Sequence, residues 1–298
     1  MNPSMTDIIH ESVKFNEPVV LVSRTGMGKT TLVKKYAKDN NMDIFNISLA
    51  SSDTATILGM NFPVDKGFIR HDSPLVTAIK KAQRPESKEL IIFFDEILSA
   101  EEEIYSVLQT LIMDNYLDYE QLKFKKVHFI GATNTVQTGS NVTMPSQSFA
   151  ERFAWFPVTN IQDWADWFYE QNQKEIPVEV KQYIQSEAKS DVEDFVQEIL
   201  DERTSPRDFT KSYELVSKGA RNLGKYVVSN ILYDSVVSLS KSKKVDKGDG
   251  LLSEQEVINY IKFYSGKKQF ELELDNLVRK YRNVYPRIQK LTKQKSNL

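Results

Sequence analysis

The sequence predicts an α/β fold with a mostly parallel sheet over residues 1–160, an α-helical domain over residues 161–240 and a charged helical extension over residues 241–298. Three observations predict this arrangement. Short apolar runs of strand length alternate with segments of helical spacing in the first part, which is typical of a three-layer core. A glycine-containing loop joins the first apolar run to a helix. Beyond residue 160, helical spacing continues without strand-like runs.

The chain opens with an amphipathic segment over residues 5–15, which predicts a short helix ending before Pro18. Residues 19–22 form an apolar run of strand length, and the loop that follows contains Gly26 and Gly28. Helical spacing resumes directly after this loop. The first elements are therefore a helix, a strand, a glycine loop and a second helix.

Four later runs are predicted strands, and the most apolar of them are expected to be buried on both faces, as parallel strands are. These strands cover residues 43–48, 90–94, 127–132 and 155–158. Residues 49–74 are predicted to be a loop-rich connection, residues 75–82 a helix, and residues 99–113 a helix that opens with a capping box at Ser99. The helices expected beyond Asn160 cover residues 161–171, 178–188, 192–200 and 206–217.

The glycine loop after the first strand has the features of a phosphate loop. Its glycines let backbone N–H groups surround an anionic phosphate, Lys29 can reach the β- and γ-phosphates, and the Thr30 hydroxyl can ligate Mg²⁺. The full pattern has glycine at its first position, where this chain has Ser23. An ordinary glycine-rich turn is the alternative. The residues predicted to bind the nucleotide are Thr25, Gly26, Met27, Gly28, Lys29, Thr30 and Thr31.

Polar residues end the two strands over residues 90–94 and 127–132. Ligands in open α/β sheets bind beyond the carboxyl ends of strands, so Asp95 and Glu96 are predicted to face the phosphate loop. Asp95 would hold Mg²⁺, and Glu96 would orient and deprotonate the attacking water, unless both are only a charge pair at a helix start. Asn134 would position that water and polarise the γ-phosphate, unless it only closes an Asx-turn.

Two arginines are candidates for contact with charge that develops on a phosphoryl group. Arg152 could meet such a group, from its own or a neighbouring subunit, or it could be a cation favoured at a helix C-terminus. Arg207 is predicted at the second position of a helix, behind Ser205 and Pro206, where a cation is electrostatically unfavourable. This position indicates an anionic partner such as a bound γ-phosphate.

Composition restricts the partners. The chain has 39 basic and 41 acidic residues and a formal charge of −2, so no overall field draws it to nucleic acid or anionic lipid. It has no cysteine, which excludes a disulfide framework and Cys-ligated zinc. We expect a cytoplasmic protein without a membrane span, because no apolar signal segment is present and apolar runs are strand-sized. The basic tail over residues 276–298 could bind nucleic acid or be a solvated helix face.

The order of these motifs resembles that of the AAA+ ATPases. The shared motifs are the phosphate loop, Ile92 to Glu96, Gly131 to Asn134, Glu151 to Phe153 and Ser205 to Arg207. Residues 51–59, which end in Leu-Gly, and residues 67–79, which contain Ser-Pro-Leu, make the chain most similar to the MoxR and dynein/midasin-related branch. The resemblance extends over about residues 5–220.

The resemblance implies a role for each candidate residue. Lys29 and Thr30 would be Walker A residues, Asp95 and Glu96 the Walker B pair, Asn134 sensor 1, Arg152 the arginine finger and Arg207 sensor 2. It further implies ATP and Mg²⁺ as ligands, a lid domain from about residue 161, and a ring, usually a hexamer, with ATP at the subunit boundaries.

We therefore expect a Mg²⁺-dependent ATP hydrolase of the MoxR-like type that remodels a protein or protein complex. Two alternatives remain at this stage. One is a nucleic-acid-associated AAA+ ATPase, such as a loader or restriction-type motor, for which the basic tail is the only support. The other is a nucleotide-gated scaffold with little turnover, which the Ser23 substitution allows.

Overall fold

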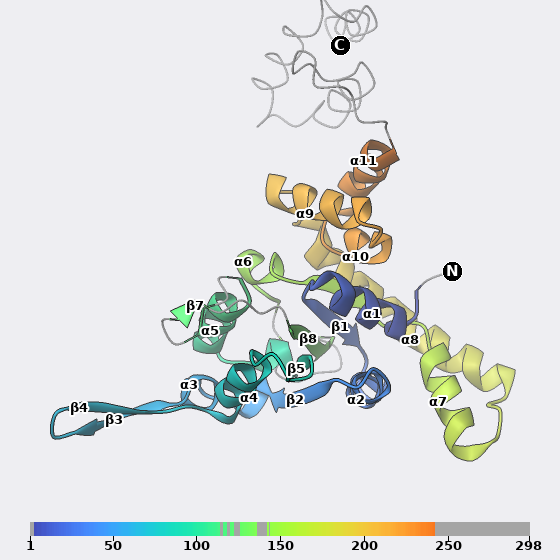
Figure 1. The fold of residues 1–298 in the computed structure, drawn as a ribbon. Coiled ribbons are helices and arrows are strands. Elements are labelled where there is room, and N and C mark those ends of the chain that lie inside the picture. Colours follow the sequence, from blue (N-terminus) through green and yellow to red (C-terminus); the bar gives the residue numbers. More distant parts are fainter. Residues whose placement is uncertain are drawn as a thin grey trace, which may run out of the picture. The chain divides into compact units, whose positions relative to one another are not determined.

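The computed structural model describes residues 3–113, 116–117, 120–121, 126–135, 142 and 144–241 (Figure 1). The chain divides into two compact units, Met1–Tyr233 and Asp234–Leu298, and each is considered by itself. All of the predicted catalytic, nucleotide-binding and metal-binding residues belong to the first unit. The predicted extension beyond residue 241, with its basic tail, lies outside the described residues.

The central sheet is built from five strands. They are β1 (Val19–Ser23), β2 (Asp43–Ser48), β5 (Leu90–Asp95), β8 (Val127–Asn134) and β9 (Ala154–Pro157). All pair in parallel, in the order β2-β5-β8-β1-β9. Consecutive residues of β1, β5 and β8 are buried almost throughout, so both faces of these strands are covered. The predicted parallel α/β core is confirmed.

The strand register gathers polar residues at one edge of the sheet. Ser23 at the end of β1 pairs with Asn134 at the end of β8, and Ser48 at the end of β2 pairs with Asp95 at the end of β5. Since β5 and β8 are neighbours, these four residues follow one another along the carboxyl edge.

The helices of the first part are α1 (Met5–Phe15), α2 (Lys29–Asp39), α3 (Thr54–Leu58), α4 (Pro74–Ala82), α5 (Glu102–Met113) and α6 (Gln147–Ala150). Those that follow the sheet are α7 (Gln162–Asn172), α8 (Val178–Asp201), α9 (Pro206–Ser217), α10 (Arg221–Lys225) and α11 (Asn230–Lys241). Their ends follow local chemistry: α1 and α9 each begin with a capping box, formed by Ser4 with Asp7 and by Ser205 with Asp208. No strand is described after β9, as predicted.

The prediction of a loop-rich connection over residues 49–74 is wrong for part of this segment, because it contains regular structure. Besides a 3₁₀ turn (Leu49–Ser51) and α3, it contains an antiparallel hairpin of β3 (Met60–Val64) and β4 (Gly67–His71), which extends beyond the sheet in Figure 1. Both strands are largely exposed. They therefore lack the buried apolar face that identifies a half-buried strand.

Other differences are smaller. The two helices predicted over residues 178–188 and 192–200 are the single helix α8, because the polar residues between them contain no glycine or proline to end it. The helix predicted to open at Ser99 begins at Glu102, and Ser99 lies in a preceding 3₁₀ turn. Two short strands, β6 (Tyr116–Leu117) and β7 (Glu120–Gln121), pair with each other and were not expected.

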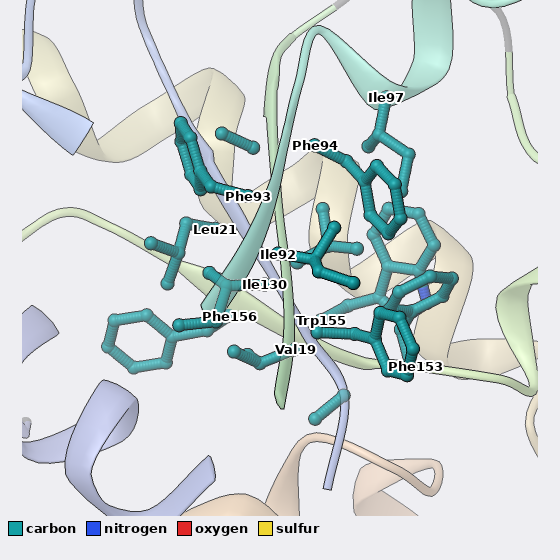
Figure 2. Packing of buried hydrophobic residues seen from close by; sticks show 14 of the residues in the cluster. Val19, Leu21, Ile92, Phe93, Phe94, Ile97, Ile130, Phe153, Trp155 and Phe156 are labelled. Carbon is teal, nitrogen blue, oxygen red and sulfur yellow. The ribbon is translucent and has the colours of Figure 1, made fainter. Parts of the chain in front are cut away.

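Aromatic side chains fill the core beside the sheet (Figure 2). Phe93, Phe153 and Trp155 are fully buried, and the Trp155 indole donates a hydrogen bond of 2.9 Å to the Ala150 carbonyl. Truncating a buried aromatic residue to alanine costs about 3–5 kcal/mol, so this packing contributes strongly to the stability of the core. No helix in the described part of the chain is long and apolar enough to cross a membrane.

Candidate nucleotide-binding site

The loop between β1 and α2 is shaped to receive an anion. Gly26 and Gly28 adopt positive φ angles of 86° and 75°, and a Cβ atom at either position would meet no atom within 4 Å. Gly28 precedes α2 without a side-chain cap, so the first backbone N–H groups of α2 have no capping side chain. Such a helix start attracts phosphate through its N–H groups and its dipole.

The Lys29 ammonium lies between two polar residues at the carboxyl edge. It donates a hydrogen bond of 2.6 Å to Ser23 Oγ and another of 3.0 Å to Asn134 Oδ1. Burial lowers the pKa of Lys29 to about 8, although the nearby Asp95 carboxylate opposes this shift. Ser23, which replaces the first glycine of the pattern, therefore contacts the lysine directly.

Thr30 and Asp95 bring two hard oxygen atoms together. The Thr30 hydroxyl donates a hydrogen bond of 2.9 Å to Asp95 Oδ2, across 65 residues of sequence. Mg²⁺ prefers oxygen ligands and usually takes only one or two from the protein, the rest being water and phosphate. The pair fits that donor set. Among the described residues, no group of three or more His, Asp or Glu side chains is arranged to hold an ion without such help.

Glu96 has a backbone conformation that few residues other than glycine adopt. Its φ and ψ angles are 56° and 43°, in the left-handed region, which costs on the order of 1 kcal/mol. Its side chain is exposed, and Ser48 Oγ donates a hydrogen bond of 2.8 Å to Glu96 Oε2. This contact places the Glu96 carboxylate beside the end of β2, at the carboxyl edge of the sheet, where it can accept a proton from a water molecule beside a bound phosphate.

The structure brings most of the predicted site residues together at the carboxyl edge. Lys29 contacts Asn134, Thr30 contacts Asp95, and Glu96 directly follows Asp95. The other predicted nucleotide-binding residues lie in the loop or the first turn of α2. They are Thr25, Gly26, Met27, Gly28 and Thr31.

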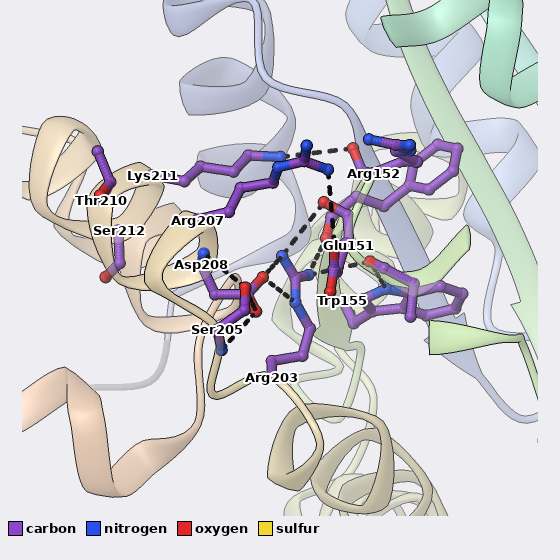
Figure 3. A network of polar contacts seen from close by, with 12 residues as sticks. Glu151, Arg152, Trp155, Arg203, Ser205, Arg207, Asp208, Thr210, Lys211 and Ser212 are labelled. Carbon is purple, nitrogen blue, oxygen red and sulfur yellow. Dashed lines mark hydrogen bonds and ion pairs between the residues drawn. The ribbon is translucent and has the colours of Figure 1, made fainter. Parts of the chain in front are cut away.

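Arg152 and Arg207 lie elsewhere, in what we call the amino-edge patch (Arg152, Arg207 and Lys211; Figure 3). Arg152 stands two residues before β9, whose first residue pairs with Val19 at the amino end of β1. Arg207 Nη1 lies 3.7 Å from the carboxylate of Glu151, the residue before Arg152. Within the described part of the chain, no hydrogen bond or ion pair joins this patch to the residues at the carboxyl edge. The length of β1, about 13 Å, separates the two edges.

Sequence reasoning missed a bridge between the phosphate loop and α8. Asp191 of α8 is buried and accepts hydrogen bonds of 2.9 Å from Arg24 Nε and 3.0 Å from the Thr135 hydroxyl. Arg24 belongs to the phosphate loop, and Thr135 directly follows Asn134. No local pattern indicates Asp191, because its partners are distant in sequence. Ser48, in contrast, could have been found, because it ends a predicted strand as Asp95 does.

Parts of the chain are similar to known proteins. A family model of the AAA domain, dynein-related subfamily, matches residues 18–153. Midasin of Giardia intestinalis is 26% identical over 185 residues, which are 59% of this chain and 4% of that protein. The chain thus spans a small part of this relative's length. A solved structure of a candidate ATPase from Cytophaga hutchinsonii is also similar. The match covers 92% of this chain and 66% of that chain, with a TM-score of 0.40 and 13% sequence identity.

The family match begins just before β1 and ends just before β9, so it contains the phosphate loop, the acidic pair after β5, and Asn134. These are the elements that the structure assembles at the carboxyl edge. Residues 18–153 of this chain are therefore similar to the AAA domain of the dynein-related subfamily.

Proposed function

We propose that this chain is an AAA+ ATPase that hydrolyses ATP in a Mg²⁺-dependent reaction at the subunit boundaries of a ring, usually a hexamer, and thereby remodels a protein or protein complex in the MoxR-like manner. The observation that carries the proposal is the contact of Lys29 with Asn134 beside the contact of Thr30 with Asp95. These residues come from three separate segments, and all lie next to the anion-receiving loop. AAA domains of this family generally assemble into rings.

Each residue has a distinct task in the proposed reaction. Lys29 exchanges Ser23 and Asn134 for the β- and γ-phosphate oxygens, while the backbone N–H groups after Gly28 hold the remaining phosphate charge. Thr30 and Asp95 would hold Mg²⁺, which would supply positive charge to neutralise the phosphates. Glu96 takes a proton from the attacking water, and Asn134 orients that water.

The pKa of Lys29 predicts how nucleotide affinity depends on pH. Because the free protein holds this pKa at about 8, and because only the ammonium form attracts phosphate, we expect constant affinity below pH 8. Above that pH, affinity should fall by about tenfold per pH unit, as protonation becomes part of binding. Calorimetry of ATP-analogue binding near pH 8, in two buffers of different ionisation enthalpy, should detect proton uptake.

The Lys29→Arg variant is the control for this pH dependence, since its guanidinium stays protonated and its affinity should not fall between pH 8 and 10. An unchanged affinity of the native protein across that range would contradict the assignment. The contribution of Lys29 to the folding stability of the nucleotide-free protein depends on pH in the opposite direction to the nucleotide affinity. The native state binds fewer protons at Lys29 than the unfolded chain does between pH 8 and 10.5, so this group's contribution to stability rises with pH there.

The position of the amino-edge patch favours catalysis between subunits. Arg152 and Arg207 are separated from the phosphate loop of their own chain by about the length of β1, which supports their action on the nucleotide of a neighbouring subunit. The side chain of Arg207 is 61% exposed, and the buried Nε atom of Arg152 has no hydrogen-bond partner. Arg207 is thus accessible to a phosphate that another chain presents, and Arg152 Nε is an unused donor beside it.

Mixing experiments test this arrangement. We expect Arg152→Ala and Lys29→Met each to abolish steady-state phosphate release alone, because each removes one half of a shared site. Subunits of the two variants mixed in equal amounts should regain activity, since roughly one interface in four would combine an intact loop with an intact arginine. Light scattering should show assembly of the mixture with ATP. Assembled mixtures without recovered turnover would count against a shared site.

The alternative of a nucleic-acid-associated ATPase has no further support, because the basic tail over residues 276–298 lies outside the described residues. A low-turnover scaffold is not favoured either. Ser23 does not block the loop, and its hydroxyl instead holds Lys29 in place.

A further inference from the structure

Arg203 is a fully buried arginine that the proposed reaction does not use. It is 0% exposed, and all five of its N–H groups have acceptors (Figure 3). Nε and Nη2 donate to Asp208 Oδ1 at 2.8 and 2.7 Å. Nη1 and Nη2 donate to three backbone carbonyls, of Ala150, Phe153 and Glu151, at 3.0, 2.5 and 3.3 Å.

The three carbonyls surround one residue. Ala150 and Glu151 precede Arg152 and Phe153 follows it, so Arg203 fixes the backbone on both sides of the candidate arginine finger. The helix before this turn, α6, has only four residues and cannot fix the turn by itself. A buried guanidinium that makes five hydrogen bonds to four acceptor atoms holds a rigid geometry that the ammonium of a lysine cannot reproduce.

Asp208 extends this support to α9. Its Oδ1 atom accepts from Arg203, whereas its Oδ2 atom accepts 2.7 Å from the Ser205 hydroxyl and 3.2 Å from the Ser205 backbone N–H. Asp208 thus joins the turn of Arg152 to the first turn of α9, which carries Arg207. The ion pair of Arg207 with Glu151 crosses the same junction.

We propose that Arg203 is a positioning residue that holds Arg152 and Arg207 as one unit facing the nucleotide of the neighbouring subunit. This inference rests on the proposed action of the two arginines between subunits. A buried ion pair is weak evidence for stability, because its desolvation opposes its attraction. The five hydrogen bonds of Arg203 instead define where the backbone of Arg152 lies. An error of about 1 Å in the position of a catalytic group can lower the reaction rate roughly 10²-fold.

The first test is Arg203→Lys, which keeps a cation beside Asp208 but cannot satisfy all three carbonyls. We expect kcat for ATP hydrolysis to fall roughly 10²-fold, while the affinity for an ATP analogue stays unchanged. Arg221→Lys, the same change at an exposed arginine of α10, is the matched control and should leave both values unchanged. A lower affinity with unchanged kcat would overturn the proposal.

Mixing separates a positioning role from a merely structural one. Arg203→Lys subunits keep an intact phosphate loop, and Lys29→Met subunits keep intact arginines, so the mixture should recover activity as the Arg152→Ala mixture does. Recovery with Arg152→Ala but none with Arg203→Lys would overturn this inference and leave the proposed function standing. Failure of both mixtures would contradict the shared site itself.

A double-mutant comparison gives a second readout. If Arg203 acts through Arg152, the double variant Arg203→Lys with Arg152→Ala should have a kcat within about twofold of that of Arg152→Ala alone. The reason is that the effects of two substitutions on one coupled unit do not add. Where Arg203→Lys unfolds the chain, the neutral pair Arg203→Gln with Asp208→Asn keeps the cap of α9 and removes both charges. Unfolding of both variants would mean that Arg203 is needed only for the fold, and would overturn the proposal.

Discussion

Glu96→Gln is expected to abolish ATP turnover while nucleotide binding survives. The substitution keeps the size of the side chain and removes the carboxylate that accepts a proton from water, a contribution of about 10²–10⁴-fold in rate. The left-handed backbone and the hydrogen bond from Ser48 should be retained, since an amide oxygen can accept that bond. Steady-state phosphate release and the affinity for an ATP analogue, measured on one preparation, test both halves of this expectation.

Glu103→Gln is the matched control, because this glutamate is exposed in the first turn of α5 and should not influence turnover. Near-normal phosphate release by Glu96→Gln would remove Glu96 from the reaction. A loss of binding together with turnover would instead mean that Glu96 supports the loop rather than the chemistry.

Lys29→Met is expected to weaken binding of ATP by about 10²-fold or more, which corresponds to about 2.7 kcal/mol. Hydrogen bonds from a charged donor contribute about 1.5–3 kcal/mol each, and the lysine would make such bonds to two phosphates. The free protein should remain folded, since burial disfavours the charged form of Lys29 in the native state. Fluorescence titration with a labelled ATP analogue and thermal unfolding without nucleotide measure the two effects.

The control for this variant is Lys34→Met, the same substitution at an exposed lysine of the same helix. It should bind the analogue normally. Equal binding by both variants would show that the loop before α2 is not where the phosphates lie.

Much of the carboxyl edge could be predicted because one topological rule places it. Parallel strands end at the same edge of a sheet, so residues that follow predicted strands meet regardless of their distance in sequence. From the sequence alone, this rule predicts that Asp95 and Asn134 lie beside the phosphate loop. It applies equally to Ser48, which the prediction left out although it ends the second strand.

The partners of Lys29 and Arg24 were not predictable in the same way. A missing glycine at position 23 indicates only a change in the loop, whereas the side chain present there supplies a hydrogen bond to Lys29. Asp191 and Arg203 act through contacts between segments far apart in the chain, and a single charged residue in or near a helix carries no sign of such a partner. The hairpin of β3 and β4 escaped prediction because exposed strands have no buried face to impose an apolar pattern.

The most direct test of the account is a structure of Glu96→Gln with ATP and Mg²⁺ bound. We expect Lys29 to leave Ser23 for the β- and γ-phosphates, Asn134 to face the γ-phosphate, and Thr30 and Asp95 to lie beside the metal ion. The amino-edge patch of a neighbouring subunit should approach the same γ-phosphate. A nucleotide bound elsewhere, with Lys29 still held by Ser23 and Asn134, would contradict the convergence of these residues on one phosphoryl group.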